Sequence, residues 1–355
     1  MIPLLMRFLN LNTVRLLDLA SQEMGRSDKI VHYQRRSLPT GNFSLEFIFA
    51  DIRRRLKGRA NIELRNAPFY SSGLFKRIGI LIDAFLCRTQ ILHVAGDITF
   101  AGILIGKPKV VLTILDCVVL SRSRGIKFAI FKFFWMTLPM RRADVITTIS
   151  ESAKNEILKY MSPQSFKIEV VYPSISEDFV FSPKEFNAQC PTILLIGTTP
   201  NKNLPRVIEA CGGISCRLKI VGSLSDEIRL QLEAKKIQYS NHVSLPFQEI
   251  IASYVDADLV MFASTYEGFG MPIIEAQRTG RPVITSRFGA MSEVAGDAAI
   301  LVDPFDVDDI RKGLMKVIQS PELRHELIEK GQKNAKRFEP SVVADQFLQI
   351  YKSLF

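Results

Sequence analysis

The stretch Ser264-Thr-Tyr-Glu-Gly-Phe-Gly-Met-Pro-Ile-Ile-Glu-Ala-Gln277 decides the fold of this chain. The apolar run in front of it, residues 257–264, predicts a buried strand, and residues 272–279 predict a short helix. Proline is favoured in the first turn of a helix and glycine just after its end, which are the places of Pro272 and Gly280. A strand, a glycine-containing loop and a helix in this order form the repeating unit of a parallel α/β sheet.

Two glutamates lie around this loop. Glu267 is in the loop itself, and Glu275 is one turn into the predicted helix. Glycine lets a backbone approach a ligand closely, and the unpaired N–H groups at a helix start attract anions. The pattern suits a ligand with hydroxyl groups on both sides of a diphosphate, as in a nucleotide-sugar. The alternative is that both glutamates are surface residues of an ordinary βα unit.

Short apolar runs alternate with helical patterns along the rest of the chain, which predicts parallel sheets covered by helices. The expected strands are residues 29–33, 91–94, 109–115, 145–150, 192–197, 217–221, 243–245, 259–263, 282–285 and 299–301. The expected helices are residues 44–56, 74–87, 125–137, 203–212, 225–236, 247–255, 272–279, 307–320, 321–338 and 341–355.

A polar segment without periodicity, residues 174–190, predicts a domain boundary. We expect an N-terminal Rossmann-like domain in residues 1–180, a C-terminal one in residues 181–340 and a final amphipathic helix in residues 341–355. Two such domains would face each other across a cleft, because ligands in these sheets bind beyond the carboxyl ends of the strands.

A second motif, Ile193-Leu-Leu-Ile-Gly-Thr-Thr-Pro-Asn-Lys-Asn-Leu204, opens the C-terminal domain. It predicts a buried strand, a loop with Gly197 and Lys202, and a helix capped by Asn203. A lysine beside backbone donors at a helix entrance can bind a diphosphate. A solvated loop lysine is the alternative, but the presence of the Glu267 motif favours the diphosphate.

The Glu-Gly-Phe-Gly-Met-Pro-Ile-Ile-Glu-Ala string resembles the E-x7-E signature of the retaining family 4 glycosyltransferases, whose fold is called GT-B. The resemblance implies two facing Rossmann-like domains, a UDP- or GDP-linked sugar donor, and a terminal helix that crosses back to the first domain. It implies that Glu267 holds the sugar hydroxyls, that Glu275 holds the ribose and that Lys202 binds the diphosphate. Asn201 stands where the family often has arginine.

The resemblance also assigns the remaining donor-site residues and a set in the first domain. Glu267 and Lys202 are the expected catalytic residues. The expected donor-binding residues are Glu275, Gly268, Phe269, Gly270, Met271, Gly197, Asn201 and, for the base, Leu245. The expected acceptor or cleft residues are Gly41, His93, Asp97 and Asp116.

Two of the first-domain assignments carry alternatives. Family members often have a histidine before the aspartate at position 116, where this chain has Leu115. His93 and Asp97 could compensate for it, whereas a core position is the more common place for such a histidine. Gly41 is expected in a loop over the donor phosphates, with a plain turn before a helix as the alternative.

Composition limits the class of protein. Hydrophobic residues make up 47% of the 355 residues and charged residues 23%, which is typical of a globular chain. The five cysteines are scattered and the chain has four histidines, so we expect reduced thiols and neither a metal site nor a cofactor. An opening apolar stretch interrupted by Arg7 and Arg15 does not suggest a signal peptide, and no apolar run is long enough to span a bilayer.

The charge is unevenly distributed. Residues 1–180 hold 26 Lys and Arg against 15 Asp and Glu, and residues 181–355 hold 20 against 21. No nucleic-acid motif accompanies this basic half, so an anionic membrane is the expected partner rather than nucleic acid. The basic, aromatic segment 121–142 with Trp135 and the Arg-rich segment 53–59 are the expected contact points, with a core helix as the alternative for the first.

The resemblance, together with these observations, implies a metal-independent retaining hexosyltransferase with a glycan or lipid-linked acceptor, acting in cell-surface polysaccharide synthesis. The expected location is the cytoplasm, with peripheral contact to the inner face of the cytoplasmic membrane. A catalytically weak nucleotide-sugar-binding protein and a nucleotide-sugar epimerase on the same fold remain as alternatives.

Overall fold

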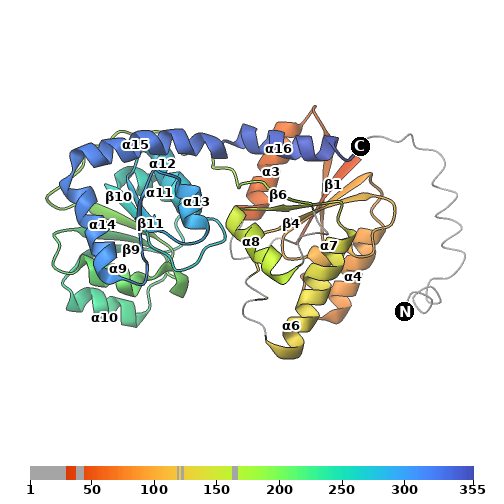
Figure 1. The fold of residues 1–355 in the computed structure, drawn as a ribbon, viewed down its shortest axis with the longest axis horizontal. Helices are drawn as coiled ribbons and strands as arrows, with labels where there is room; N and C mark the ends of the chain where they lie inside the picture. Colours follow the sequence, from red (N-terminus) through yellow and green to blue (C-terminus); the bar gives the residue numbers. More distant parts are fainter. Residues whose placement is uncertain (1–28, 37–43, 118–119, 121–123, 162–166) are drawn as a thin grey trace, which may run out of the picture.

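The computed structural model describes residues 29–36, 44–117, 120, 124–161 and 167–355. They form two parallel β-sheets with helices packed around them, placed side by side along the long axis of the molecule (Figure 1). Gly41 lies outside the described residues.

The first sheet has the strand order β2-β1-β3-β4-β5-β6. Its strands are β1 (Lys29–Gln34), β2 (Asn61–Asn66), β3 (Ile91–Ala95), β4 (Lys109–Ile114), β5 (Val145–Thr148) and β6 (Ile168–Val170). The central strands are nearly continuous buried runs, as a parallel sheet covered on both faces requires. The register of β1 and β3 places His32 beside His93.

The second sheet has the order β12-β11-β10-β7-β8-β9. Its strands are β7 (Thr192–Ile196), β8 (Arg217–Val221), β9 (Gln238–His242), β10 (Leu259–Phe262), β11 (Val283–Ser286) and β12 (Ile300–Val302). The first strand, β7, lies between β8 and β10, so the strand order reverses there. A point of this kind at the carboxyl ends of parallel strands is where α/β sheets bind ligands.

Helices cover both faces of the first sheet. One face packs against α4 (Leu74–Phe85), the 3₁₀ turn η1 (Thr99–Gly102), α6 (Gly125–Phe131), the π-helix η2 (Lys132–Thr137), α7 (Leu138–Arg142) and α8 (Glu151–Tyr160). The other face packs against α3 (Ser44–Leu56) and the last helix, α16 (Pro340–Lys352). Residues from the end of the chain therefore complete the core of its first sheet.

The second sheet is covered in the same way. One face packs against α9 (Leu204–Cys211), α10 (Asp226–Ala234), α14 (Val307–Gln319) and α15 (Pro321–Ala335). The other face packs against α11 (Phe247–Asp256), α12 (Met271–Thr279) and α13 (Ala290–Ala295). In Figure 1, α15 continues through the short turn η5 (Lys336–Phe338) into α16, which runs from the second sheet to the first.

The structure corrects several expected elements. The expected strand at 243–245 is wrong, because the edge strand is β9, one step earlier; its Gln-Tyr-Ser-Asn-His sequence is polar and has no apolar run to detect. The edge strands β2 and β6 and the short helix α13 are also absent from the prediction. The helix expected at 125–137 contains the π-helical segment η2 and continues through α7.

Among the described residues, no helix is both long and apolar enough to cross a bilayer.

Candidate active site at the carboxyl ends of β7 and β10

The loop after β7 shapes the position of Lys202. The buried strand β7 is followed by Gly197, whose φ of 87° is in the left-handed region that favours glycine. A β-carbon at this position would lie 2.8 Å from Lys202 Cε, so the missing side chain also makes room for the lysine. The 3₁₀ turn η4 (Pro200–Lys202) then directs Lys202 towards β10.

Lys202 and Glu267 meet at the point where the sheet reverses. Lys202 Nζ lies 2.8 Å from Glu267 Oε1 and 4.4 Å from the centre of the Phe262 ring. Asn201 Nδ2 donates to the same Glu267 oxygen at 3.0 Å and to the carbonyl oxygen of Tyr266 at 3.0 Å. The side chains of the ion pair are 18% and 16% exposed, so they remain accessible while being held in a fixed arrangement.

Glu275 is enclosed one turn into α12. The hydroxyl of Tyr254 donates to Glu275 Oε2, and burial raises the pKa of this carboxyl to about 7, while the Tyr254 hydrogen bond and the Lys202 charge oppose the rise. Glu267 and Glu275 thus lie on the two sides of the start of α12, the first in the loop before the helix and the second one turn into it.

The residues between the two glutamates serve different purposes. Gly270 has a φ of 114° and precedes Met271, the first residue of α12, so the chain turns sharply into the helix. Phe269 is buried against the rings of Tyr172 and Phe338. Phe269 is therefore an anchor of the loop, whereas Gly270 sets the direction of the helix start.

Gly268 brings the loop against the first sheet. Ser150 Oγ donates to the Gly268 carbonyl oxygen at 2.9 Å, and a β-carbon on Gly268 would lie 3.7 Å from the carbonyl oxygen of Leu115. Leu115 and Ser150 follow β4 and β5, so the carboxyl ends of both sheets meet here. Ser150 also caps α8, because its Oγ accepts a hydrogen bond from the N–H of Ala153.

A cavity of about 470 Å³ lies beside this meeting point. It is bordered by α8 on one side and by Tyr266, Glu267 and α13 on the other. Tyr266 donates to Glu156 Oε2 at 2.9 Å, and Glu293 accepts from the N–H groups of Glu151 and Ser152 at 2.7 and 3.0 Å. The cavity is therefore spanned by hydrogen bonds that join the two halves of the chain.

The expected first-domain residues are only partly at the cleft. Asp116 is exposed at the end of β4, next to the Gly268 loop. Asp97 is exposed after β3, and its carboxylate lies 4.0 Å from Arg35. The structure thus places these two aspartates at the carboxyl edge of the first sheet, as predicted from their positions after strands.

His93 is not a cleft residue. It is fully buried, its ring nitrogens lie 2.7 Å from the Tyr351 hydroxyl and 2.6 Å from Thr113 Oγ1, and burial lowers its pKa to about 3. The reason is α16, which covers the face of the sheet to which His93 points. A neutral histidine enclosed in this way cannot contact a ligand.

The structure also locates Asn203 and Leu245. Asn203 does not cap α9 with its side chain; it has left-handed backbone angles, and its amide donates to the carbonyl oxygens of Ala263 and Pro304. Leu245 lies in the loop after β9, two strands away from β7 in the sheet. The sequence contained no signal for Tyr254 or Glu293, because each is a partner brought in from another element.

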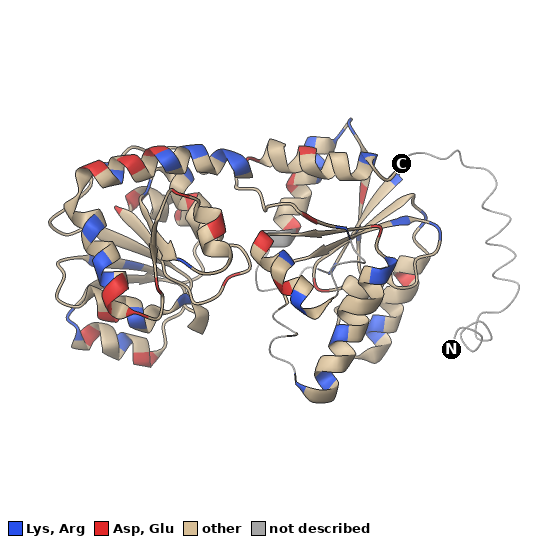
Figure 2. Ribbon diagram, viewed as in Figure 1, with Lys and Arg blue, Asp and Glu red and all other residues tan. Residues whose placement is uncertain are grey.

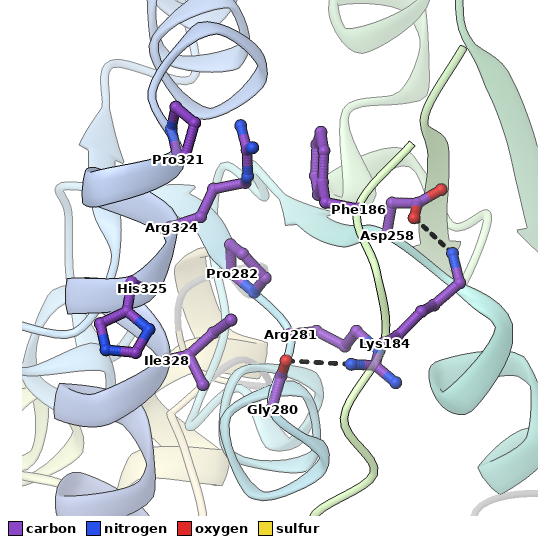
Figure 3. A pocket seen from close by; sticks show the side chains of 10 residues that line it. All are labelled: Lys184, Phe186, Asp258, Gly280, Arg281, Pro282, Pro321, Arg324, His325 and Ile328. Atoms are coloured by element: carbon purple, nitrogen blue, oxygen red, sulfur yellow. Dashed lines mark hydrogen bonds and ion pairs between the residues drawn. The ribbon is translucent and has the colours of Figure 1, made fainter. Parts of the chain in front are cut away.

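A second cavity, of about 180 Å³, lies away from this cluster, where the chain enters β10 and β11 (Figure 3). Its buried Asp258 accepts from Lys184 Nζ and from the N–H groups of Asn187 and Thr192. Arg281 donates to the carbonyl oxygens of Tyr254, Val255 and Ser182. These contacts hold the segment that leads into β7 against the strands β10 and β11. The charged residues around the cavity therefore have a structural role.

Among the residues that the structure describes, no group of three or more His, Cys, Asp or Glu side chains is placed to hold a metal ion.

Comparison with solved structures establishes the class of the fold. Sucrose-phosphate synthase from Thermosynechococcus elongatus superposes with a TM-score of 0.75 at 14% identity, over 93% of this chain and 99% of that one. Anabaena HepE, solved with UDP and glucose, gives 0.73 at 15% identity, over 92% and 100%. WaaG, a glycosyltransferase involved in lipopolysaccharide biosynthesis, gives 0.67 at 14% identity, over 90% and 99%. The fold is GT-B, as predicted.

Sequence comparison gives a family match in the second half. Residues 176–334, which contain the cluster around Lys202 and Glu267, match the family model of the group 1 glycosyl transferases.

Curated relatives share the same region. O-antigen chain mannosyltransferase B of Escherichia coli is 28% identical over 238 residues, which cover 60% of this chain and 61% of that protein. MMP alpha-(1->4)-mannosyltransferase of Mycolicibacterium hassiacum is 26% identical over 226 residues, covering 60% and 54%. The chain thus spans a little over half the length of these relatives.

Proposed function

We propose that this protein is a retaining glycosyltransferase that moves a mannosyl group from a UDP- or GDP-linked donor to a glycan or lipid-linked acceptor in cell-surface polysaccharide synthesis. The observation that carries the proposal is the Lys202–Glu267 pair at the point where the second sheet reverses, with Glu275 one turn away. The mannosyltransferase names of the relatives support the choice of sugar and of pathway.

Each member of the cluster has a separate task in this proposal. Lys202 exchanges its partner Glu267 for the donor diphosphate, and the start of α12 adds backbone donors to the same charge. Glu267 then accepts hydrogen bonds from the sugar hydroxyls, and Glu275 from the ribose. The cationic and dipolar groups offset the charge that develops on the leaving diphosphate, without a metal ion.

The proposed reaction needs no protein nucleophile. The acceptor hydroxyl attacks the anomeric carbon from the face that the diphosphate leaves, the new C–O bond forms as the old one breaks, and a diphosphate oxygen takes the hydroxyl proton. Retention follows from attack on that face. The role of the protein is to align the two substrates and to exclude water from the reacting groups.

Asn201 has a different role from the arginine often found at its position in family 4. Its amide donates to both Glu267 and the Tyr266 carbonyl, so it positions the glutamate rather than adding a second charge. Together with Leu115 in place of histidine, this departure leaves a weak binding protein as the competing candidate.

A transfer assay separates the candidates. The protein is incubated with UDP- and GDP-linked sugars, with and without a mannose-containing lipid-linked acceptor, and free nucleotide and glycosylated product are measured. The expected result is nucleotide release with a matching product only when the acceptor is present, unchanged by EDTA. Binding without product would support the weak binding protein, and a changed sugar still attached to its nucleotide would support an epimerase.

A further inference from the structure

The outer face of α4 is apolar although it is exposed. Phe75, Ile78, Ile82 and Phe85 are all exposed, and Phe75 is 88% exposed. Their spacing of three, four and three residues puts them on one stripe of the helix. The core of the sheet takes the opposite stripe, which includes Ile80 and Ala84, so packing within the described structure does not account for the outer one.

The neighbouring helix repeats this pattern. In α6 and η2, Ile126, Ile130, Phe133 and Phe134 are exposed, and Ile126 is 80% exposed. The two helices lie side by side (Figure 1), and the guanidinium of Arg77 on α4 lies 4.7 Å from the ring centre of Trp135 on η2. The two stripes form one surface, which we call the α4–η2 face.

The exposed charges on this face are basic. Lys76 and Arg88 flank the α4 stripe, and Arg124 and Lys127 flank the α6 stripe, all of them exposed. The sequence has no acidic residue between positions 116 and 144. The acidic residue of α4, Asp83, is turned inward to Arg65 and Tyr33. Figure 2 shows the blue Lys and Arg positions along this helix pair.

We propose that the α4–η2 face docks on an anionic lipid bilayer, with the apolar stripes at headgroup depth and the basic residues against the lipid phosphates. Helices with an apolar stripe and flanking Lys and Arg lie in the membrane interface, and anionic lipids strengthen the contact. A second copy of the chain is a poorer occupant, since it would place basic residues against basic residues. This inference goes beyond the proposed transfer activity and does not depend on it.

Two of the contact points expected from the sequence have partners within the chain. In the Arg-rich segment 53–59, Arg54 and Arg55 are paired with Asp51 and Glu177, on the face of the sheet opposite α4. Trp135 is only partly exposed and packs on Phe100. The residues that we expect to dock are those of the exposed stripes on α4 and on α6 and η2. The segment 121–142, expected from the sequence, includes the second stripe but not the one on α4.

Trp135 connects this face to the cleft. Its indole N–H donates to the carbonyl oxygen of Asp97 at 3.1 Å, and Asp97 follows β3 at the carboxyl edge of the first sheet. A chain docked through the α4–η2 face would therefore hold the Asp97 edge of its cleft close to the membrane surface, where the reacting end of a lipid-linked acceptor is found.

Vesicle co-sedimentation tests the inference with the full chain. Wild type is compared on phosphatidylcholine vesicles with and without phosphatidylglycerol, at low and high salt. The variants are Phe75→Ser/Ile126→Ser, Lys76→Glu/Lys127→Glu and a deletion of residues 1–28. The control Leu230→Ser/Lys312→Glu changes an exposed leucine and an exposed lysine of the second half. Circular dichroism and nucleotide binding verify that each variant is folded, independently of any transfer activity.

The expected result is binding to the anionic vesicles that weakens with salt, that falls by about tenfold or more in each double variant of the face, and that is unchanged in the control and in the deletion. No binding at low salt, or equal binding by the face variants, would overturn the inference. Loss of binding only in the deletion would assign the contact to residues 1–28. A dimer in light scattering that disappears in Phe75→Ser/Ile126→Ser, without vesicle binding, would assign the face to a second copy.

Discussion

At the scale of single residues, Lys202 and Glu267 form an ion pair with each other. The lysine is also held over Phe262, a contact with a ring face that is compatible with its charge. A diphosphate brings more negative charge than a carboxylate, so it can displace Glu267 from Lys202 and leave that carboxylate available to sugar hydroxyls. Donor binding would then rearrange one ion pair into two productive contacts.

We predict that Lys202→Ala weakens binding of a nucleoside diphosphate by about 1–3 kcal/mol, the usual contribution of a hydrogen bond to a charged group, and leaves binding of the nucleoside nearly unchanged. Isothermal titration calorimetry with both ligands measures the difference. The matched control is Lys219→Ala, which removes a lysine of β8 that is paired with Asp256 of α11. An equal loss for nucleoside and diphosphate would refute the assignment.

Replacement of Glu275 is expected to change the stability of the protein and its nucleotide affinity in opposite directions. Burial raises its pKa to about 7 from an ordinary value of 4.5. Between these two pH values the folded state binds more protons than the unfolded state, so stability falls as the pH rises and the whole penalty is present above pH 7.

Glu275→Gln should therefore raise the free energy of unfolding at pH 8 by about 1–3 kcal/mol, because the amide keeps an acceptor for Tyr254 and never ionises. The gain should vanish at pH 4.5. Nucleotide affinity at pH 8 should fall, since a ribose hydroxyl loses a charged acceptor. Thermal denaturation at both pH values and calorimetry provide the measurements; a variant that is less stable at pH 8 would contradict the account.

At the scale of elements, α16 is held to the first sheet by a buried polar network. The Tyr351 hydroxyl lies 2.8 Å from His32 Nε2 and 2.7 Å from His93 Nδ1. Burial lowers the pKa of both histidines, to about 3 for His93, and the nearby charges of His93 and Arg53 add to the lowering for His32. The helix is thus attached through groups that must stay neutral.

Acid should therefore weaken this attachment. Unfolded histidine takes up a proton near pH 6.5 and the buried rings do not, so the free energy of unfolding should decrease as the pH falls from 6.5 towards 3. Tyr351→Phe should cost about 1–3 kcal/mol at pH 7, because two buried ring nitrogens lose their shared partner. Urea denaturation at several pH values tests both statements. A stability that is flat between pH 6.5 and 4 would show that the histidines are not responsible.

At the scale of the whole molecule, the two sheets are joined at the cleft as well as through α15 and α16. Glu293 of α13 binds the first N–H groups of α8, Ser150 binds the Gly268 carbonyl, and Tyr266 binds Glu156. A carboxylate at a helix N-terminus is favourable both as a hydrogen-bond acceptor and through the helix dipole. These contacts border the cavity of about 470 Å³ that adjoins Glu267.

Glu293→Ala should loosen this junction. We expect a larger radius of gyration in small-angle X-ray scattering and a higher KM for the acceptor, with donor affinity within about twofold of wild type. The reason is that removal of a half-buried carboxylate from a helix N-terminus costs on the order of 1 kcal/mol. Glu329→Ala, at an exposed glutamate of α15, is the control. An unchanged radius together with an unchanged KM would show that the junction does not depend on this carboxylate.

The sequence by itself determined the parts that depend on local chemistry. Continuous apolar runs such as Leu259–Phe262 predicted strands buried on both faces, and Gly270, Pro272 and Gly280 marked the limits of α12. Because parallel strands end at one edge, the loops with Lys202 and Glu267 could be expected to meet, and they do. The edge strand β9 was missed, since it is polar and only its neighbour β8 defines it.

Only the tertiary structure decided which side chains are buried and which element covers each of them. His93 follows the same strand pattern as a cleft residue, but a helix more than 240 residues later in the chain covers it. Arg54 and Arg55 belong to a basic stretch of sequence, but both pair with Glu177 in the structure. The exposure of Phe75 on the outer stripe of α4 depends on how that helix packs. Burial, ionisation and partner choice depend on distances between segments remote in sequence, and local periodicity contains no information about those distances.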